Sequence, residues 1–388
     1  MAGRLAGFLL LLILALPASG ASWRLRGYWR TGVSFTRYGP DHTGGTGYAP
    51  LRLSVSGMHA SSPSFEAAYV LTPLVADSTG LADGSPSEFR IADLEKFLYG
   101  GGANRSGNFA VRQNLDRLNI GFHVALTDII AGRQAIYWGV SKAVSPTDFI
   151  APWQFDEVYT EYRRGVDGVR VVVPVGALSE VDVAWLFGRD GQLSLDGSYA
   201  RGRIYVARTD VTLLAADFRE NLMIGASLNR TVGGATAWLE GAWTRAGQFS
   251  DDSLDTEDFL ALSAGADYSF GGTLYGFLEY HLNTAGSTRW EDYGELLETK
   301  AYSTGGIYLL GVHYLCPGLT AQLSPLLSVS GTSLVNLFDP SACFVLRGEY
   351  SAAEDVMLES GLFLGAGAPE SEFGSYPDRG YASVVLYF

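Results

Sequence analysis

The feature that most constrains this chain is a period-two alternation of apolar and polar residues, which begins near residue 24 and recurs to the last residue. In segment 24–36 one parity carries Leu25, Trp29, Val33 and Phe35, and the other carries arginine, serine and threonine. A strand whose two faces meet different surroundings produces this pattern. The segment is longer than the ~5–6 residues of an average strand and matches a tilted strand that crosses a bilayer.

The alternation recurs often enough to build a whole barrel. It returns in segments 51–56, 117–126, 180–187, 222–229, 260–270, 274–282, 344–350 and 356–364. Short connections at 127–128, 231–234, 271–272, 316–318 and 352–355 alternate with long polar ones at roughly 74–112, 140–164, 247–258, 283–305 and 367–379. Short turns at one end and long loops at the other are typical of outer-membrane barrels. Counting the weak segment 211–217, we predict an all-β, antiparallel, up-and-down transmembrane barrel of about 18 strands, within 16–20.

Composition and charge agree with this fold class. The chain has 388 residues with 48 glycines, 20 Phe, 21 Tyr and 8 Trp, and only 18% charged residues. Such a profile disfavours a disulfide scaffold, a disordered chain and a helix-rich soluble enzyme. The net charge of −14 disfavours nucleic-acid binding, which requires a basic face.

The two ends of the chain predict export and assembly. Residues 1–21 carry Arg4, an apolar run and a small-residue cleavage site, which is typical of a signal peptide; a transmembrane helix is the alternative, but the run is short. We therefore expect one outer-membrane barrel domain over 22–388, in contact with lipid and lipopolysaccharide. The C-terminal Phe388, after alternating apolar residues, is typical of the signal that the barrel-assembly machinery recognises. The oligomeric state stays open.

Charges on the polar parity divide between the two halves of the chain. The basic residues that we expect to line the pore are Arg24, Arg26, Arg30, Arg52, Arg117, Arg133, Arg170 and Arg203, and the acidic ones are Glu240, Asp267, Glu279, Glu349 and Glu359. A chain that circles the barrel once would place these sets on opposite walls, which predicts a transverse field for charged solutes. The alternative is that the arginines pair structurally with acids, or reflect genomic base composition.

Segment 141–153 is less polar than an exposed loop. Phe149 and Ile150 lie between its two prolines and Trp153 directly follows the second, with Lys142 and Asp148 nearby. We expect this segment to fold into the barrel as a constriction loop, with Lys142, Asp148, Phe149 and Trp153 as its key residues. A loop packed over the rim, or a subunit contact, is the alternative.

Four motifs in this part of the chain resemble a known family. Segments 113–118 (QNLDRL), 131–139 (AGRQAIYWG), 145–148 (SPTD) and 161–170 (EYRRGVDGVR) resemble proteobacterial porin-like outer-membrane barrels, the group that includes alginate-export-type proteins. The resemblance implies passive passage of a solute or polymer across the outer membrane, with Arg133 and Arg170 in the lumen and Asp148 in the constriction loop. The acidic second half departs from what a polyuronate channel would need.

Other chemistry finds little support in the sequence. None of the five histidines has metal-ligand spacing, and no motif nominates a cofactor, a metal or a catalytic group, so we expect none and no enzyme activity. Cys316 and Cys343 either form a disulfide or remain unpaired. The sequence therefore favours a porin-like channel for small charged or polar solutes, or for an anionic oligomer. A sheath around a periplasmic or electron-carrying partner is the alternative, and an outer-membrane hydrolase is less favoured.

Overall fold

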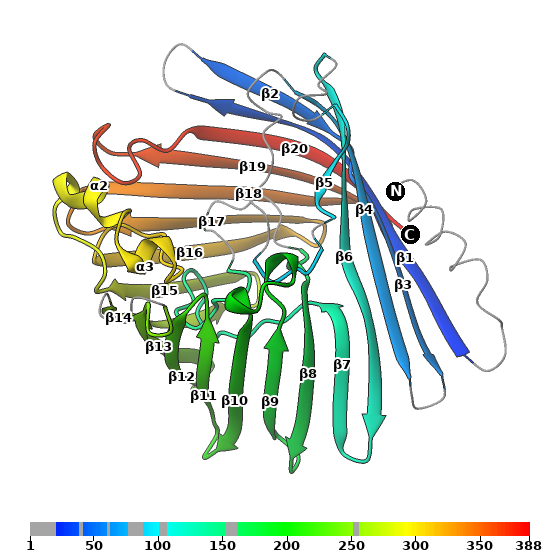
Figure 1. Ribbon diagram of the computed structural model, residues 1–388. Helices are drawn as coiled ribbons and strands as arrows, with labels where there is room; N and C mark the ends of the chain where they lie inside the picture. The colour runs from blue at the N-terminus through cyan, green and yellow to red at the C-terminus, as the bar shows by residue number, and fades with distance from the viewer. Residues whose placement is uncertain are drawn as a thin grey trace.

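The computed structural model shows a closed antiparallel β-barrel (Figure 1). It describes residues 21–38, 42–59, 63–76, 88–92, 94–100, 107–152, 155, 161–250 and 256–388. The predicted signal peptide lies outside the described residues, apart from Ala21, where the first strand begins. Among the described helices, none has the length and the apolar character that a membrane span requires.

The strands follow one another around the barrel in chain order. The first half contains β1 (Ala21–Arg37), β2 (Thr43–Tyr48), β3 (Leu51–His59), β4 (Ser64–Ala76), β5 (Lys96–Tyr99), β6 (Phe109–Val124), β7 (Thr127–Gln134), β8 (Val166–Val175), β9 (Ser179–Leu186), β10 (Gly197–Val206) and β11 (Thr209–Phe218). The second half contains β12 (Asn221–Val232), β13 (Ala235–Ala246), β14 (Glu257–Phe270), β15 (Leu274–Asn283), β16 (His313–Ser324), β17 (Leu327–Asn336), β18 (Ser341–Ala353), β19 (Val356–Ala366) and β20 (Asp378–Tyr387).

The closed ring has eighteen strand positions, as the alternation predicts. β2 and β3 lie end to end between β1 and β4 and together fill one position. β5 only extends the sheet beside β6. Pairing of β1 with β20 closes the ring, from Tyr28 opposite Tyr387 to Arg37 opposite Asp378. Closure gives the backbone N–H and C=O groups of β1 and β20 hydrogen-bond partners. The lipid bilayer has none to offer.

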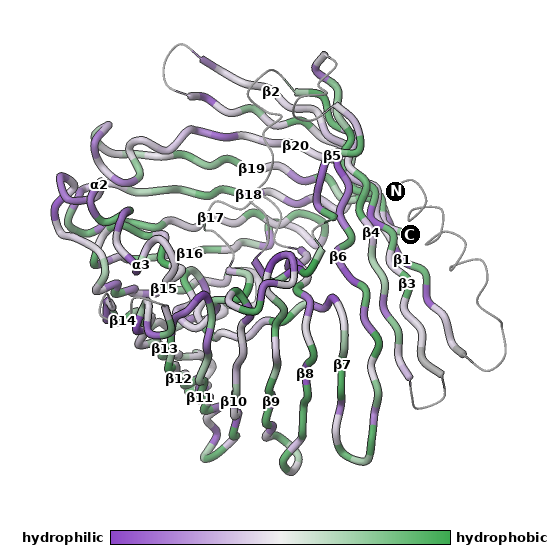
Figure 2. Tube along the Cα trace, viewed as in Figure 1, coloured by the Kyte–Doolittle hydropathy of each residue, from purple (hydrophilic) through white to green (hydrophobic). Residues whose placement is uncertain are grey.

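The two faces of the wall differ as the alternation predicts. Large apolar side chains on the outward parity are exposed, including Leu25, Trp29, Phe122, Trp185 and Leu278. Their inward neighbours are polar or buried, and Figure 2 shows the resulting alternation of hydrophobic and hydrophilic residues along the strands. The outer face is therefore suited to lipid and the inner face to a polar lumen.

Connections are short at one end of the barrel and mostly long at the other. Short turns join β6 to β7, β8 to β9, β10 to β11, β12 to β13, β14 to β15, β16 to β17 and β18 to β19. The opposite end carries loops 135–165, 284–312 and 367–377, and the 3-10 helices η2 (Arg189–Gly191), η3 (Leu193–Leu195) and η4 (Trp290–Asp292) with the short helices α2 (Tyr293–Leu296) and α3 (Lys300–Ser303). The weak segment 211–217 is part of β11.

One predicted turn is wrong and another is displaced. The turn predicted at 127–128 lies at 125–126, and 127–128 begins β7. Segment 316–318 lies inside β16 rather than at a strand end, although Pro317 cannot donate a ladder hydrogen bond. Toward β17 the pairing is interrupted between Leu315 and Gly318, while toward β15 it is continuous. A neighbour on both sides holds the strand in place, which a single-sequence turn signal cannot anticipate.

Candidate functional site

The described parts of the loop between β7 and β8, residues 135–152, 155 and 161–165, lie against the inner wall of the barrel. The entry of the loop requires Gly139, whose φ of 134° is unfavourable for other residues. Glu240, on the inward face of β13, then accepts hydrogen bonds from the loop: Oε2 from Val140 N, Ser141 N and Ser141 Oγ at 2.8–2.9 Å, and Oε1 from Ser145 Oγ and Thr147 Oγ1 at 2.6 Å and Thr147 N at 3.2 Å. One buried carboxylate therefore holds four loop residues, at both ends of the segment 140–147.

A second carboxylate continues this anchor on β15. Glu279 Oε1 accepts hydrogen bonds from the backbone N–H groups of Ala143 and Val144, at 3.2 and 3.0 Å, and Oε2 accepts from Lys142 N at 2.7 Å and Trp238 Nε1 at 2.8 Å. Between the two carboxylates, Ser263 of β14 donates to Val144 O at 2.6 Å. Because this uses the only hydroxyl proton, His281 Nδ1, 2.8 Å away, is the donor to Ser263 Oγ.

Apolar packing holds the next part of the same loop. Phe149 and Ile150 are buried, and Phe149 stacks on Phe218 with ring centroids 4.6 Å apart. Trp138 packs between Phe149 and Tyr199 and donates to Thr147 O at 3.2 Å. The apolar residues that distinguish this loop in the sequence therefore contact the wall, and they do not face open solvent.

The last part of the loop reaches the opposite side of the lumen. Glu161 accepts a hydrogen bond from Arg30 of β1 at 3.2 Å, and Tyr162 stacks on Tyr28 at 5.9 Å and lies beneath Arg52 at 4.1 Å. Arg163 returns to the loop itself, where it pairs with Asp148 and donates to Ala151 O at 2.7 Å. The loop thus contacts both β13–β15 and β1–β3, which face each other across the ring (Figure 1).

A second loop, residues 284–312, joins the first inside the barrel. Leu309 O accepts from Asn283 Nδ2 at 2.8 Å and from the Tyr302 hydroxyl at 2.7 Å, and Leu309 and Tyr308 pack with Val144 of the first loop. The alternation predicts only an ordinary polar loop at 283–305. The sequence signal for the inward loop is the apolar run 307–310 after a Gly-Gly pair, which does not have period-two spacing.

The third loop, residues 367–377, secures the second. Glu372 accepts from Leu310 N at 2.8 Å, from the Tyr314 hydroxyl at 2.6 Å and from Asn336 Nδ2 at 2.8 Å. Asp339 accepts from Glu372 N at 2.7 Å. Burial raises the pKa of Glu372 to about 7, against the opposing effect of these hydrogen bonds.

Asp148 is a buried titratable group of the first loop, and its pKa is shifted far from the usual value of an aspartate. Burial raises the pKa of Asp148 to about 6, although the Arg163 guanidinium beside it acts in the opposite direction. The pair is nearly enclosed, with side-chain exposures of 5% for Asp148 and 9% for Arg163. The net charge of the Asp148–Arg163 pair therefore changes near pH 6.

The arginines of the first half lie on the inner wall, and most of them are ion-paired. Arg52 pairs with Asp116 at 2.5 Å, Arg117 with Asp116 at 2.8 Å, Arg133 with Asp167 at 2.7 Å, Arg170 with Asp182 at 2.7 Å and Arg203 with Glu180 at 3.6 Å. Arg24 and Arg26 are exposed, and neither is ion-paired within the described part of the chain. Most partners come from the same half of the chain, so the basic wall is largely compensated locally.

The five expected pore-lining acids occupy three different settings. Glu240 and Glu279 are fully buried under the loop that they anchor. Asp267 accepts from the Tyr275 hydroxyl at 3.0 Å and lies 3.6 Å from Lys142 Nζ, which also sits over the Trp238 ring. Glu359 pairs with Arg30 across the closing seam at 3.2 Å, and Glu349 is exposed on β18. Trp153 lies outside the described residues.

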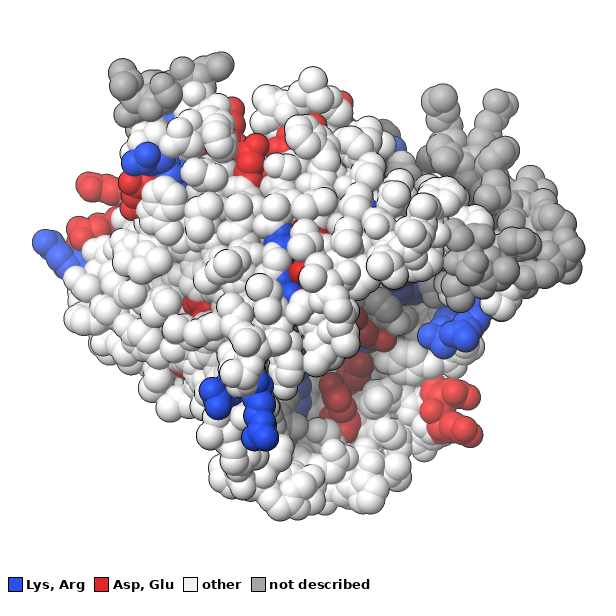
Figure 3. Space-filling view, turned by 90° about the horizontal axis from the view of Figure 1, so that it is seen from below, with Lys and Arg blue, Asp and Glu red and all other residues white. Residues whose placement is uncertain are grey.

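Figure 3, which views the molecule from below, shows a mostly uncharged surface with acidic and basic side chains gathered around a hollow and along the rim. Among the described residues, no three His, Cys, Asp or Glu side chains are grouped to hold a metal ion. Cys316 and Cys343 are both buried and unbonded. Leu334 of β17 lies between their positions, which puts them two strands, about 9.6 Å, apart and beyond the reach of a disulfide.

Comparison with known proteins gives a result at the level of structure. No described protein family and no curated protein matches the sequence. Solved structures match over nearly the whole chain: Acinetobacter baumannii OccAB1, 10% identical with a TM-score of 0.60 over 94% of this chain and 96% of that one; and Pseudomonas aeruginosa OccK8 (OprE), 10% identical with a TM-score of 0.59 over 95% and 98%.

A third matching structure was solved with a small molecule. It is Pseudomonas aeruginosa OpdK with vanillate, 9% identical with a TM-score of 0.57 over 95% of this chain and 98% of that one. These neighbours are outer-membrane porins of the Occ and OprD type, and the alginate-export-type group is not among them. At this identity the likeness concerns the fold: the chain has the fold of the Occ and OprD porins of Pseudomonas and Acinetobacter.

Proposed function

We propose that this protein is a porin-like channel of the bacterial outer membrane, which passes small charged or polar solutes by passive diffusion. The observation that supports the proposal is a closed barrel with an apolar outer face and a polar inner face, to which a loop is hydrogen-bonded. Two buried carboxylates hold that loop, and we propose that it narrows the lumen. A wide lumen without such a loop would not discriminate between solutes by size.

The structural neighbours support this function. The three named above are outer-membrane porins, and one of them was solved with vanillate, a small carboxylate. A loop that contacts both sides of the lumen leaves little room for a threaded protein or a thick polymer. This favours small solutes over the sheath and over the anionic oligomer. The relationship to alginate-export-type barrels stays a prediction from segments 113–170.

Selectivity in this proposal comes from a few charged groups beside the loop. Lys142 is 41% exposed next to Asp267, and Arg30, Arg52 and Arg117 lie where the loop ends on the opposite wall. Arginine keeps its charge and can exchange a carboxylate partner in the wall for one on a solute. We therefore propose a series of exchanging ion pairs along the path, with a mild preference for anions.

Conductance of the purified barrel in planar bilayers tests the proposal. We expect discrete, ohmic openings, with a reversal potential that shifts toward chloride in a salt gradient. Liposome swelling should show faster entry of small acids than of neutral sugars of equal size. Protein that inserts in the membrane but conducts no ions would contradict the channel, and co-purification with a tightly bound periplasmic protein would favour the sheath.

A further inference from the structure

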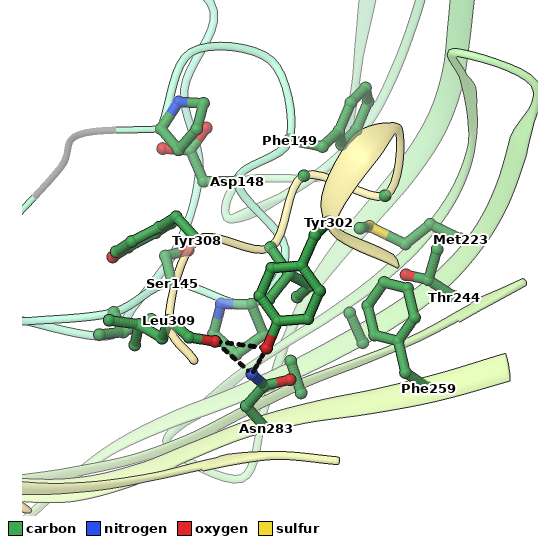
Figure 4. Close-up of a pocket in the computed structure, with 18 of the residues that line it drawn as sticks. Ser145, Asp148, Phe149, Met223, Thr244, Phe259, Asn283, Tyr302, Tyr308 and Leu309 are labelled. Carbon is green, nitrogen blue, oxygen red and sulfur yellow. Dashed lines mark hydrogen bonds between the residues drawn. The ribbon is translucent and has the colours of Figure 1, made fainter. Parts of the chain in front are cut away.

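A cavity of about 240 Å³ lies between the two inward loops and the barrel wall (Figure 4). Strands β12–β15 form its floor, and residues 144–152 and 302–309 form its sides. The cavity is bounded by the loop between β7 and β8. The charged groups proposed above to guide solutes, Lys142, Asp267, Arg30, Arg52 and Arg117, are not among its described lining residues. None of the roles proposed above uses it.

One row of side chains gives the cavity its chemical character. Met223, Thr244 and Phe259 lie opposite one another on β12, β13 and β14. All three are buried, and Thr244 is fully enclosed, yet its hydroxyl has no hydrogen-bond partner among the described residues. Figure 4 shows the hydroxyl oxygen on the side that faces Tyr302. A buried hydroxyl without a partner is unfavourable, and it marks a place where a ligand or water would bind.

Aromatic rings line the other side of the cavity, and none of the described lining residues carries an unpaired charge. Phe149 and Tyr302 lie across the cavity from this row. The two charged lining residues are both engaged, Asp148 with Arg163 and Arg219 with Glu88. A charged ligand would lose its hydration here without gaining a partner, whereas a flat ring would gain aromatic and thioether contacts.

We propose that this cavity is a binding site for a small uncharged aromatic molecule that carries a hydroxyl group, that is, a phenol. The ring packs between Met223, Phe149 and Phe259, and its hydroxyl forms a hydrogen bond with the Thr244 hydroxyl. Cavities of ~150 Å³ already bind benzene, so the space suffices. Since one wall of the site is the constriction loop, an occupied site holds that loop against the barrel.

Ligand-observed fluorine NMR tests this site on the purified full-length barrel in detergent micelles, with empty micelles as the blank for partitioning. 4-Fluorophenol should bind saturably, and fluorobenzene, which lacks the hydroxyl, about five- to tenfold more weakly, the effect of one hydrogen bond. Thr244→Val keeps the shape, and it should lower 4-fluorophenol affinity to the fluorobenzene level while leaving fluorobenzene unchanged. Ala242→Phe fills the cavity and should abolish binding of both.

Three results would overturn the proposal. Equal affinity for 4-fluorophenol and fluorobenzene would show an apolar void without the hydroxyl contact, or a cavity whose threonine is satisfied by water. Tighter binding of 4-fluorobenzoate would require an unpaired cation. Signals identical to those of empty micelles would mean that no site exists. None of these readouts depends on conduction, so the site and the proposed channel function fail separately.

Discussion

At the scale of single residues, the inward carboxylates have two different roles. Glu240 and Glu279 accept hydrogen bonds from the backbone of the loop, whereas Asp267 and Glu359 lie beside cations on the wall. A buried carboxylate is tolerated when several N–H and O–H groups surround it. The same residue type thus serves as an anchor in one place and as a charge for solutes in another.

Removing the first anchor should release the constriction. In Glu240→Ala the N–H groups of Val140, Ser141 and Thr147 lose their acceptor, at a cost of roughly 1–3 kcal/mol for each group that stays buried. The cheaper outcome is a displaced loop, so we expect larger single-channel conductance and more current noise. Glu354→Gln, in the exposed turn between β18 and β19, is the control and should leave both unchanged. Equal conductance of the Glu240 variant and the wild type would show that the loop does not limit the current.

The Asp148–Arg163 pair should make ion selectivity depend on pH. Because the pKa of Asp148 is raised to about 6, the pair is neutral above that pH and carries one positive charge below it. We expect the reversal potential to shift toward anions as pH falls from 7 to 5. The raised pKa also means that this group lowers stability as pH rises from about 4 to about 6. Asp148→Asn should remove the step near pH 6, and Asp355→Asn, in an exposed turn, should retain it.

At the scale of elements, each strand is a boundary between lipid and lumen. On β15, Leu278 is outward and 51% exposed, while its neighbour Glu279 is inward and fully buried. A shift of one residue would exchange these surroundings, so register and function are linked. The hairpin with β14 keeps the register through consecutive pairs from Ala261 opposite Asn283 to Phe270 opposite Leu274.

Leu278→Arg tests the outward assignment of this strand. An arginine on the lipid face near the bilayer midplane costs about 2–4 kcal/mol. We expect the free energy of unfolding in liposomes, measured by guanidinium titration, to fall by that amount. Leu278→Phe keeps an apolar side chain at the same place and should remain within ~1 kcal/mol of the wild type. If the arginine variant were as stable as the wild type, this face would not contact lipid.

At the scale of the whole molecule, the barrel is closed by its two ends. Besides the β1–β20 ladder, Phe388 N donates to Gly27 O at 3.0 Å and Gly27 N donates to Phe388 O at 2.8 Å. The seam also brings Glu359 of β19 to Arg30 of β1, so a charge from each half of the chain meets there. The charge division along the chain is therefore locally neutralised at this point of the circle.

Deleting Phe388 separates folding from assembly. The folded barrel loses two terminal hydrogen bonds, about 1–3 kcal/mol, so refolding of the purified chain into detergent should remain efficient. In cells we expect a marked loss of heat-modifiable barrel from the outer membrane, since the predicted assembly signal is gone. Phe388→Tyr retains an aromatic terminus and should assemble normally. A deletion variant that assembles as well as the wild type would remove the proposed role of this residue.

Much of the fold could be predicted from the sequence because its cause is local. Leu118, Ile120 and Phe122 are apolar and their neighbours polar wherever the strand lies, so the alternation survives without any knowledge of partners. The turn at 316–318 was mispredicted for the opposite reason. There, two neighbouring strands hold Pro317 in line, and that influence is tertiary.

The sequence by itself determined the alternation of faces, the strand number and the apolar character of the loop around Phe149, because each depends on neighbouring residues or on the solvent that a face meets. Only the tertiary structure decided which inward charges contact the lumen. Glu240 and Asp267 look alike in the sequence, but one is covered by the loop and the other is beside Lys142. The second inward loop, the cavity at Thr244 and the separation of the two cysteines also depend on contacts between segments that are separate in the sequence, which no local pattern encodes.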